Sequence, residues 1–177
     1  ILEISRRYGA NAIIRPENIS GDYESSESAW KHAIDFIESK SKQSIDYVLA
    51  PQVTSPLRDA SDFSNAICQI NAEKADSLLS VAKIEDFFIW GRKNTENPHS
   101  INYDYKDRKP RQLIDETYIE NGSFYIFRPE VLIKENNRLG GNISLFLMSK
   151  YKMFQIDNIE DIELSSVIMK GFNLDQT

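Results

Sequence analysis

Apolar and polar residues alternate along the chain in segments typical of a protein that contains both strands and helices. Three aliphatic runs are too short for typical helices and predict strands at Asn11–Arg15, Ile45–Ala50 and Ser77–Ile84. The two segments between them repeat apolar residues at helical spacing, Trp30, Ala33, Ile34 and Ile37 in the first and Phe63, Ala66, Ile67 and Ile70 in the second. The order β-α-β-α-β predicts an α/β fold, a parallel sheet covered by helices on both faces.

Residues with characteristic capping roles mark the ends of these helices. A first helix from Ile1 to Tyr8 is closed by Gly9. The serines of SSES offer N-caps for a helix that runs to about Lys40, and Asp59 is the expected N-cap of a helix that runs toward Ala72.

The second half of the chain follows a different pattern. After an aromatic patch at Phe87–Trp90, the polar stretch Gly91–Arg111 shows no period, and long loops of this kind are usually functional or disordered. Further elements are expected beyond it: strands at Gly122–Phe127 and Ile143–Met148, helices at Pro129–Glu135 and Ile159–Lys170, and an extended segment at Phe154–Asp157.

Length and composition restrict the class of protein. The 177 residues fit one domain, and a net charge of −6 without a dense basic run argues against nucleic acid and anionic membranes as partners. Cys68 is the single cysteine, which favours a cytoplasmic protein without disulfides. With two histidines, a zinc site rich in His or Cys is close to excluded, whereas Mg²⁺ held by carboxylates and phosphates remains open. No apolar stretch is long enough to span a bilayer.

The segment QVTSPLR follows a predicted strand directly. Gln52, Thr54 and Ser55 supply donors and acceptors there, and Arg58 supplies a fork for an anion. Ligands of open parallel sheets bind at the carboxyl ends of the strands. The alternative is a rigid turn, framed by prolines, whose hydroxyls satisfy local backbone groups.

Other candidate residues also stand at the ends of expected elements. Asp157 either holds Mg²⁺ or caps the following helix. Arg111 could bind a carboxylate through two hydrogen bonds, while Asn121-Gly122 is equally typical of a turn. Ser26 either binds an oxygen ligand at a helix N-terminus or caps the helix.

Taken in order, these motifs resemble the acylneuraminate cytidylyltransferases, the CMP-sialic acid synthetase family, along essentially the whole chain. The similar segments are RRYGA and RPENIS, SSESAWKHAIDFIE, QVTSPLR, PRQ at 110–112, ENG at 120–122 with Tyr125, and ID at 156–157. Any one of them is a weak signal, whereas five in register are a strong one.

The resemblance implies a three-layer α/β/α Rossmann-like nucleotidyltransferase fold with a mostly parallel sheet. It also implies transfer of CMP from CTP to the anomeric hydroxyl of a nonulosonic acid, with release of pyrophosphate. The roles implied are cytidine binding by Arg15 and Ser26, sugar binding by Gln52, Thr54, Ser55, Asn121 and Tyr125, a grip on the sugar carboxylate by Arg111, and Mg²⁺ binding by Asp157; Arg111 and Asp157 are the expected catalytic residues.

The chain departs from the family pattern in three places. The glycine- and lysine-containing phosphate loop of the family is expected before Ile1, so 1–177 reads as a single cytidylyltransferase domain without that segment. Gln155 stands where the family usually has an aspartate, and Asp86-Phe87-Phe88 replaces a His-Pro element. The glutamine would weaken Mg²⁺ binding or leave that role to Asp157 alone. The replaced His-Pro element approaches the sugar side, which favours a substrate other than ordinary N-acetylneuraminate, such as a legionaminic, pseudaminic or related bacterial acid.

Residues 87–111 are the part of the chain expected, by resemblance, to pack across a homodimer; a flexible surface loop is the alternative.

Two other functions compete with the leading hypothesis. One is a cytidylyltransferase for another acidic sugar, 3-deoxy-manno-octulosonate, in which PRQ followed by ENG is not expected. The other is a non-catalytic homologue that binds a nucleotide or a sugar, supported by Gln155 and the missing loop.

Overall fold

The computed structural model describes residues 2–85 and 87–174, without the side chain of Arg111. Ile1 and Asp86, which belong to the expected first helix and to the replaced His-Pro element, lie outside the described residues. The helices are α1 (Leu2–Arg7), α2 (Ser26–Ser41), α3 (Ala60–Glu73), α4 (Pro129–Glu135) and α5 (Ile159–Gly171), with 3₁₀ turns η1 (Glu17–Ile19), η2 (Arg111–Leu113) and η3 (Lys150–Met153). The strands are β1 (Val48–Pro51), β2 (Ser77–Ile84), β3 (Trp90–Gly91), β4 (His99–Ser100), β5 (Thr117–Phe127) and β6 (Ile143–Met148).

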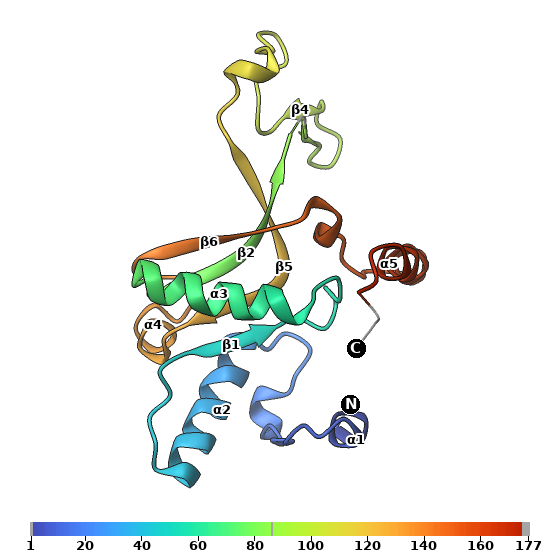
Figure 1. Cartoon of the computed structure of the whole chain (residues 1–177). Coiled ribbons are helices and arrows are strands. Elements are labelled where there is room, and N and C mark those ends of the chain that lie inside the picture. Colours follow the sequence, from blue (N-terminus) through green and yellow to red (C-terminus); the bar gives the residue numbers. More distant parts are fainter. Residues whose placement is uncertain (1, 86, 175–177) are drawn as a thin grey trace. The chain divides into compact units, whose positions relative to one another are not determined.

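The chain divides into two compact units. Unit 1 comprises Ile1–Ala50, Ala66–Leu79 and Tyr125–Ser144, and unit 2 comprises Pro51–Asn65, Ser80–Phe124 and Leu145–Thr177. A four-stranded sheet in the order β1-β5-β2-β6 contributes residues to both units, and β3 and β4 form a separate antiparallel pair in unit 2 (Figure 1). The prediction of one domain over 1–177 stays a prediction.

Hydrogen bonds within unit 1 establish the directions of the four strands. The phenol of Tyr47, before β1, donates to the carbonyl of Ala75, before β2. The amides of Asp76 and Ser77 donate to Asn142, before β6, while the amide of Arg128, after β5, donates to Asp76. Strands β1, β2 and β6 therefore begin together where β5 ends, so the sheet is mixed: β1, β2 and β6 are parallel and β5 runs against them.

The core of unit 1 packs α2 and α4 together. Trp30 of α2 contacts Phe127 of β5, with ring centroids 5.3 Å apart. Arg138 lies over the rings of Trp30 and Tyr125 and donates through Nε to Glu27 at 2.9 Å. The predicted helical face of α2 is only partly buried, since Ile34 is buried and Ile37 is 43% exposed.

Most element boundaries agree with the sequence pattern, and the caps explain several of them. Ser25 caps α2 by accepting from the amide of Ser28, and the Asp59 carboxylate accepts from the second and third residues of α3. Gly9 closes α1 in the left-handed region with φ 80°.

Two expected elements differ from the structure. The predicted strand at Asn11–Arg15 is wrong, because this segment has no strand pairing and Ile14 is 70% exposed. Strand β5 begins at Thr117, five residues before the expected Gly122. The Asn121-Gly122 pair lies inside this strand and is not a turn between elements.

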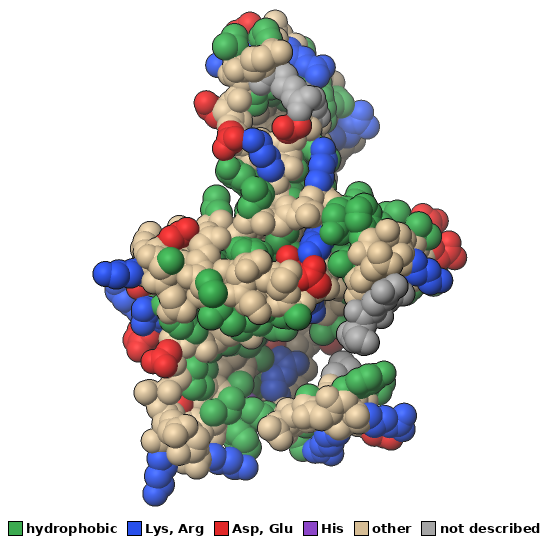
Figure 2. Space-filling model, in the orientation of Figure 1, with side chains coloured by type: hydrophobic (Ala, Val, Ile, Leu, Met, Phe, Trp, Pro, Cys, Tyr) green, Lys and Arg blue, Asp and Glu red, His purple; other side chains and the backbone are tan. Residues whose placement is uncertain are grey.

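Residues 87–116, between β2 and β5, form an excursion of unit 2 that contains the short strands β3 and β4. Strand β2 leads into it and β5 begins where it ends, and within it β3 pairs with β4 (Figure 1). The indole Nε1 of Trp90 donates to the Tyr103 hydroxyl at 2.8 Å, and Arg108 lies over the ring of Phe88. The short pair β3–β4 is regular structure that the aperiodic sequence of this stretch does not reveal. Figure 2 shows hydrophobic side chains on the surface of the excursion, interspersed with charged ones.

Candidate functional site

The carboxyl ends of β1, β2 and β6 all belong to unit 2, where ligands of parallel strands are expected. Two of the segments singled out from the sequence meet there. The amide of Ile156 donates to the carbonyl of Thr54 at 2.8 Å, which joins the ID motif to the QVTSPLR loop. Residues more than a hundred positions apart in the chain therefore build one surface.

The QVTSPLR loop is held closed by its own arginine. Arg58 Nη1 donates to the backbone carbonyls of Gln52, Ser55 and Ser123. Burial lowers the pKa of Arg58 from its usual value, and the nearby carboxylate of Asp62 partly offsets this. Arg58 Nη1 therefore stabilises the loop and is not available for the two-pronged contact with an anion that the sequence led us to expect.

Asn121 connects the loop to the interior of unit 2. It is fully buried, and its Oδ1 accepts from Ser80 Oγ at 2.6 Å and from the amide of Ser123 at 3.1 Å. Its Nδ2 donates to Met148 Sδ and, at 3.5 Å, to the carbonyl of Lys152. Such a satisfied buried amide fixes β5 where Gly122 interrupts its regular backbone.

Gly122 adopts a positive φ of 62° and lies beneath two side-chain amides. A Cβ at this position would lie 2.9 Å from Gln52 Oε1, 3.1 Å from Gln155 Nε2 and 3.2 Å from Gln155 Oε1. Both amides are half-buried and approach the same point of the backbone. The position requires glycine both for its backbone conformation and for the space above it.

Lys152 anchors the segment that carries Gln155. Its side chain is 5% exposed, and its Nζ lies 2.7 Å from both Asp59 Oδ2 and Asp62 Oδ2 at the start of α3. Burial alone lowers the pKa of Lys152, but the hydrogen bonds to the two carboxylates outweigh it and raise the pKa above its usual value. The hydrogen bond from Lys152, helped by Ser61, lowers the pKa of Asp59 to about 2.

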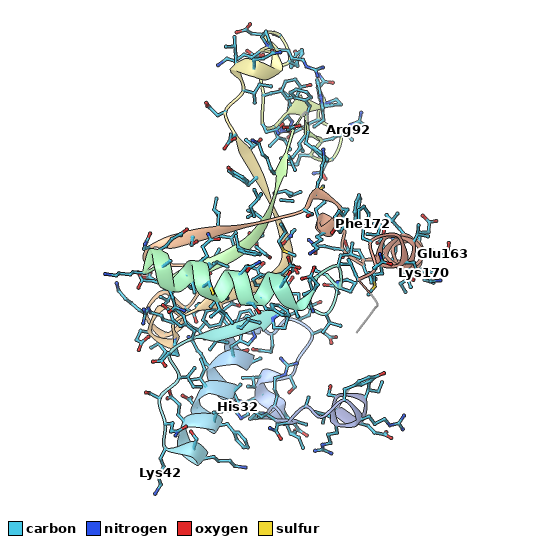
Figure 3. All side chains as sticks on the ribbon, in the orientation of Figure 1. His32, Lys42, Arg92, Glu163, Lys170 and Phe172 are labelled. Atoms are coloured by element: carbon cyan, nitrogen blue, oxygen red, sulfur yellow. The ribbon has the colours of Figure 1, made fainter. Side chains whose placement is uncertain are left out.

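A second contact supports the same segment at the far end of α5. The ring of Tyr151 in η3 stacks on that of Phe172, which is labelled in Figure 3, with centroids 3.7 Å apart and an interplanar angle of 6°. The segment between η3 and α5 includes Gln155 and Asp157. The contacts of Lys152 and Tyr151 in η3 hold its first end, and the contact of Phe172, which follows α5, ties that helix to η3.

Asp157 is exposed and does not cap α5. The N-cap is Asn158, whose Oδ1 accepts from the amide of Asp161, while Asp161 Oδ2 accepts from the amides of Asp157 and Asn158. The capping alternative for Asp157 is therefore wrong. Its carboxylate accepts no hydrogen bond from a described residue. No group of three or more His, Cys, Asp or Glu that could hold a metal occurs among the described residues.

The remaining predicted sugar-binding residues of unit 2 differ in exposure. Thr54 is exposed, whereas Ser55 is 1% exposed and its buried Oγ has no hydrogen-bond partner among the described residues. Arg111 begins η2, and its side chain lies outside the described atoms.

Three predicted site residues belong to unit 1. Arg15 is exposed after a segment without regular structure. Ser26 is the exposed first residue of α2, and since Ser25 is the N-cap, the capping alternative for Ser26 is wrong. Tyr125 is 3% exposed, with Arg138 over its ring.

Two residues of this site, Lys152 and Gln155, are not revealed as functional by the sequence pattern. Lysines are rarely buried, and the one local signal at Lys152 is its place between Tyr151 and Met153. In the sequence, Gln155 is only a departure from the resembled family, whereas in the structure its side chain lies with that of Gln52 over Gly122.

The excursion holds a cavity of about 400 Å³. It is lined by apolar and acidic groups, among them Phe87, Phe88, Tyr103, Asp104 and Asp115. Apart from Arg111, whose side chain is not described, none of the sugar- or nucleotide-binding residues expected from the sequence lines it. Within the part of the chain that the structure covers, none of the helices has the length and apolar character needed to cross a membrane.

Comparison with known proteins supports the resemblance in part. No protein-family model matches the chain. The pseudaminic acid cytidylyltransferase of Campylobacter jejuni subsp. jejuni serotype O:23/36 (strain 81-176) is 26% identical over 172 residues, which cover 96% of this chain and 74% of that protein. The protein of the same name from serotype O:2 (strain ATCC 700819 / NCTC 11168) gives the same identity and coverage.

A further relative carries a different name. Post-translational flagellin modification protein B of Campylobacter coli is 21% identical over 175 residues, 98% of this chain and 74% of that protein. The homologues that match most of this chain at 21–26% identity thus include pseudaminic acid cytidylyltransferases, which form a sialic-acid-type cytidylyltransferase family.

Proposed function

We propose that this protein transfers CMP from CTP to the anomeric hydroxyl of a nonulosonic acid, for surface glycan biosynthesis. The observation that carries the proposal is the 26% identity to pseudaminic acid cytidylyltransferases over 96% of the chain. The meeting of the QVTSPLR loop with the ID segment at the carboxyl ends of parallel strands supports it.

The reaction needs positioning and neutralisation of charge more than covalent chemistry by the protein. The anomeric oxygen of the sugar forms a bond to the α-phosphorus of CTP, the α–β anhydride bond breaks, pyrophosphate leaves and the hydroxyl proton passes to solvent. Arg15 and Ser26 are the proposed contacts to the cytidine part. Gln52, Thr54 and Ser55 of unit 2 are the proposed contacts to the sugar, and the Ser55 hydroxyl, which has no hydrogen-bond partner among the described residues, supplies a donor there. Asn121, which is buried and hydrogen-bonded, is proposed to hold β5 in place beside them.

Asp157 is the residue proposed to hold Mg²⁺. Its exposed carboxylate is free of hydrogen bonds from described residues, which fits a cation that takes one or two protein carboxylates and completes its shell with phosphates and water. When bound, the ion supplies neutralisation of phosphate charge. The Asn158–Asp161 capping box fixes the backbone beside this carboxylate.

Release of pyrophosphate tests the function directly. The protein, incubated with CTP and Mg²⁺, is expected to release pyrophosphate in the presence of pseudaminic, legionaminic or N-acetylneuraminic acid. Absence of release with every sugar would contradict the enzyme and favour the non-catalytic homologue. Turnover with 3-deoxy-manno-octulosonate alone would instead identify the other acidic-sugar cytidylyltransferase.

Arg111→Ala tests the proposed grip on the sugar carboxylate. Loss of a bidentate charge-assisted contact should raise KM for the sugar about tenfold or more and leave KM for CTP nearly unchanged. Arg92→Ala is the matched control, because Arg92 is an exposed arginine of the same excursion (Figure 3). An equal rise in both KM values for Arg111→Ala would refute the carboxylate role.

We also propose that residues 87–111 form the surface of a homodimer and that the enzyme acts in the cytoplasm. Several apolar side chains of the excursion are exposed, including Trp90 at 48% and Ile101 at 60%. Exposed apolar groups on an ordered hairpin are typical of an interaction surface.

A further inference from the structure

Gln155 lies beside Gln52 at one point of the backbone of unit 2. The Cβ position of Gly122 is within 3.2 Å of the side-chain amides of both glutamines, although Gln52 follows β1 and Gln155 follows η3. This close approach gives Gln155 a neighbour that the proposed function already places at the sugar.

The backbones around the two glutamines are fixed, while their amides are not engaged. The Ile156–Thr54 hydrogen bond and the Lys152 anchor hold the two segments together. Neither side-chain amide donates to or accepts from another described residue. Polar groups held in place by their surroundings but without a protein partner are suited to bind a ligand.

The chemistry of two neutral amides selects the kind of ligand group. Each amide offers both an acceptor oxygen and donor hydrogens, which complement a hydroxyl or a secondary amide. Mg²⁺ prefers carboxylate, phosphate and water oxygens, so a glutamine at 155 is less suited to the ion than the aspartate of the resembled family. The exposed Asp157 carboxylate, two residues further, is left for that role.

We propose that Gln155 is a specificity-determining residue that binds, together with Gln52, an uncharged hydroxyl or N-acyl substituent of the sugar. The proposal rests on the proposed function and deepens it. It assigns position 155 to the sugar and not to the metal.

Two substitutions separate these assignments. Gln155→Ala removes both donor and acceptor, and should raise the sugar KM about tenfold, with CTP KM and the Mg²⁺ concentration for half-maximal activity unchanged. Gln155→Glu keeps the size but loses the donors and adds a negative charge beside an anionic sugar. It should weaken the sugar at least as much. Gln43→Ala, an exposed glutamine of unit 1, is the matched control and should change neither constant.

A binding measurement separates recognition of the sugar from turnover. Calorimetric titration of pseudaminic acid into protein saturated with CMP, without metal, should give a Kd about tenfold higher for both Gln155 variants than for the wild type. Their unfolding midpoints should stay at the wild-type value, because neither amide has a hydrogen-bond partner in the described structure to lose.

The outcomes distinguish this inference from the proposed function. If the wild type neither binds nor converts any nonulosonic acid, the proposed function fails and this inference with it. If the wild type is active but both variants keep the wild-type sugar KM and Kd, this inference alone is overturned. It is also overturned if Gln155→Glu lowers the Mg²⁺ requirement while the sugar constants stay unchanged.

Discussion

Gly122 shows how one residue can set the geometry of a site. It combines a φ of 62° with a position in the middle of β5, where most residues favour extended conformations. Asn121 beside it is buried and its side-chain amide is hydrogen-bonded. The irregular backbone at Gly122 is therefore held in one conformation. The space that the absent side chain leaves is filled by the amides of Gln52 and Gln155.

Gly122→Ala should therefore affect both stability and sugar binding. The left-handed backbone costs a non-glycine residue about 1–2 kcal/mol, and the added Cβ displaces both amides. Urea unfolding should show this loss, and the sugar KM should rise severalfold.

Gly9→Ala is the control for this substitution. Gly9 also has a positive φ, of 80°, but no atom of a described residue lies within 4 Å of its Cβ position. It should lose a similar free energy of unfolding and keep the wild-type sugar KM. If both variants keep that KM, the contact between Gly122 and the two glutamines does not matter for the sugar.

The lowered pKa of Asp59 leads us to expect that the folded protein loses stability in acid. Its pKa in the folded protein is about 2, below the usual 3.8, mainly because Lys152 donates to it. A depressed carboxyl pKa adds stability that is present above the unfolded value and is lost as the pH falls through about 2. The free energy of unfolding should therefore decrease between about pH 4 and pH 2.

Asp59→Asn isolates this charge, because asparagine is an equally good N-cap for α3. The difference in unfolding free energy between wild type and variant should be largest near neutral pH and shrink below about pH 4. A difference that stays constant down to pH 2 would show that the ion pair with Lys152 does not set the pKa of Asp59.

At the scale of elements, the sequence pattern predicts the secondary structure of most segments but not the tertiary contacts that each segment makes. Strand β2 and helix α4 begin and end where the apolar runs and Pro129 indicate. Asn11–Arg15 has the composition of a strand but no partner strand, and pairing is what stabilises a strand. Residue pairs such as Lys152 with Asp62 depend on the tertiary fold, so no local pattern reveals them.

Lys152→Met tests how much the anchor between η3 and α3 contributes. Removal of the ammonium leaves the carboxylates of Asp59 and Asp62 near each other without a counter-charge. Breaking a buried pair of this kind costs roughly 3–5 kcal/mol. We expect the lower part of this range because Asp59 is 38% exposed. The sugar KM should also rise, since Gln155 lies on the released segment.

Lys150→Met is the matched control in the same turn, because Lys150 is exposed. It should change the free energy of unfolding by less than about 0.5 kcal/mol. Equal losses for the two variants in urea unfolding would contradict an anchor specific to Lys152.

For the whole molecule, the alternation of strands and helices predicted the α/β class and parallel strands but not the strand order. In the sheet, β5 lies between β1 and β2 although it follows both in the chain. Such pairing depends on contacts between residues far apart in the chain, and the periodicity of hydrophobic residues contains no information about them. The site is predictable to a similar extent: the QVTSPLR and ID motifs can be identified from local sequence, whereas the hydrogen bond between Ile156 and Thr54 and the approach of Gln52 and Gln155 to Gly122 depend on the fold.

The exposed apolar side chains of residues 87–111 lead to a prediction about the oligomeric state. If residues 87–111 form the homodimer surface, Ile101→Asp should place a charge in the interface and convert the dimer to monomer in analytical ultracentrifugation. Ile101 is 60% exposed, and Ile133 of α4, at 65%, offers a matched control outside the excursion. Ile133→Asp should leave the dimer intact, because a charge at an exposed position away from an interface costs little. A monomeric wild type, or equal dissociation by both substitutions, would contradict the assignment of this surface.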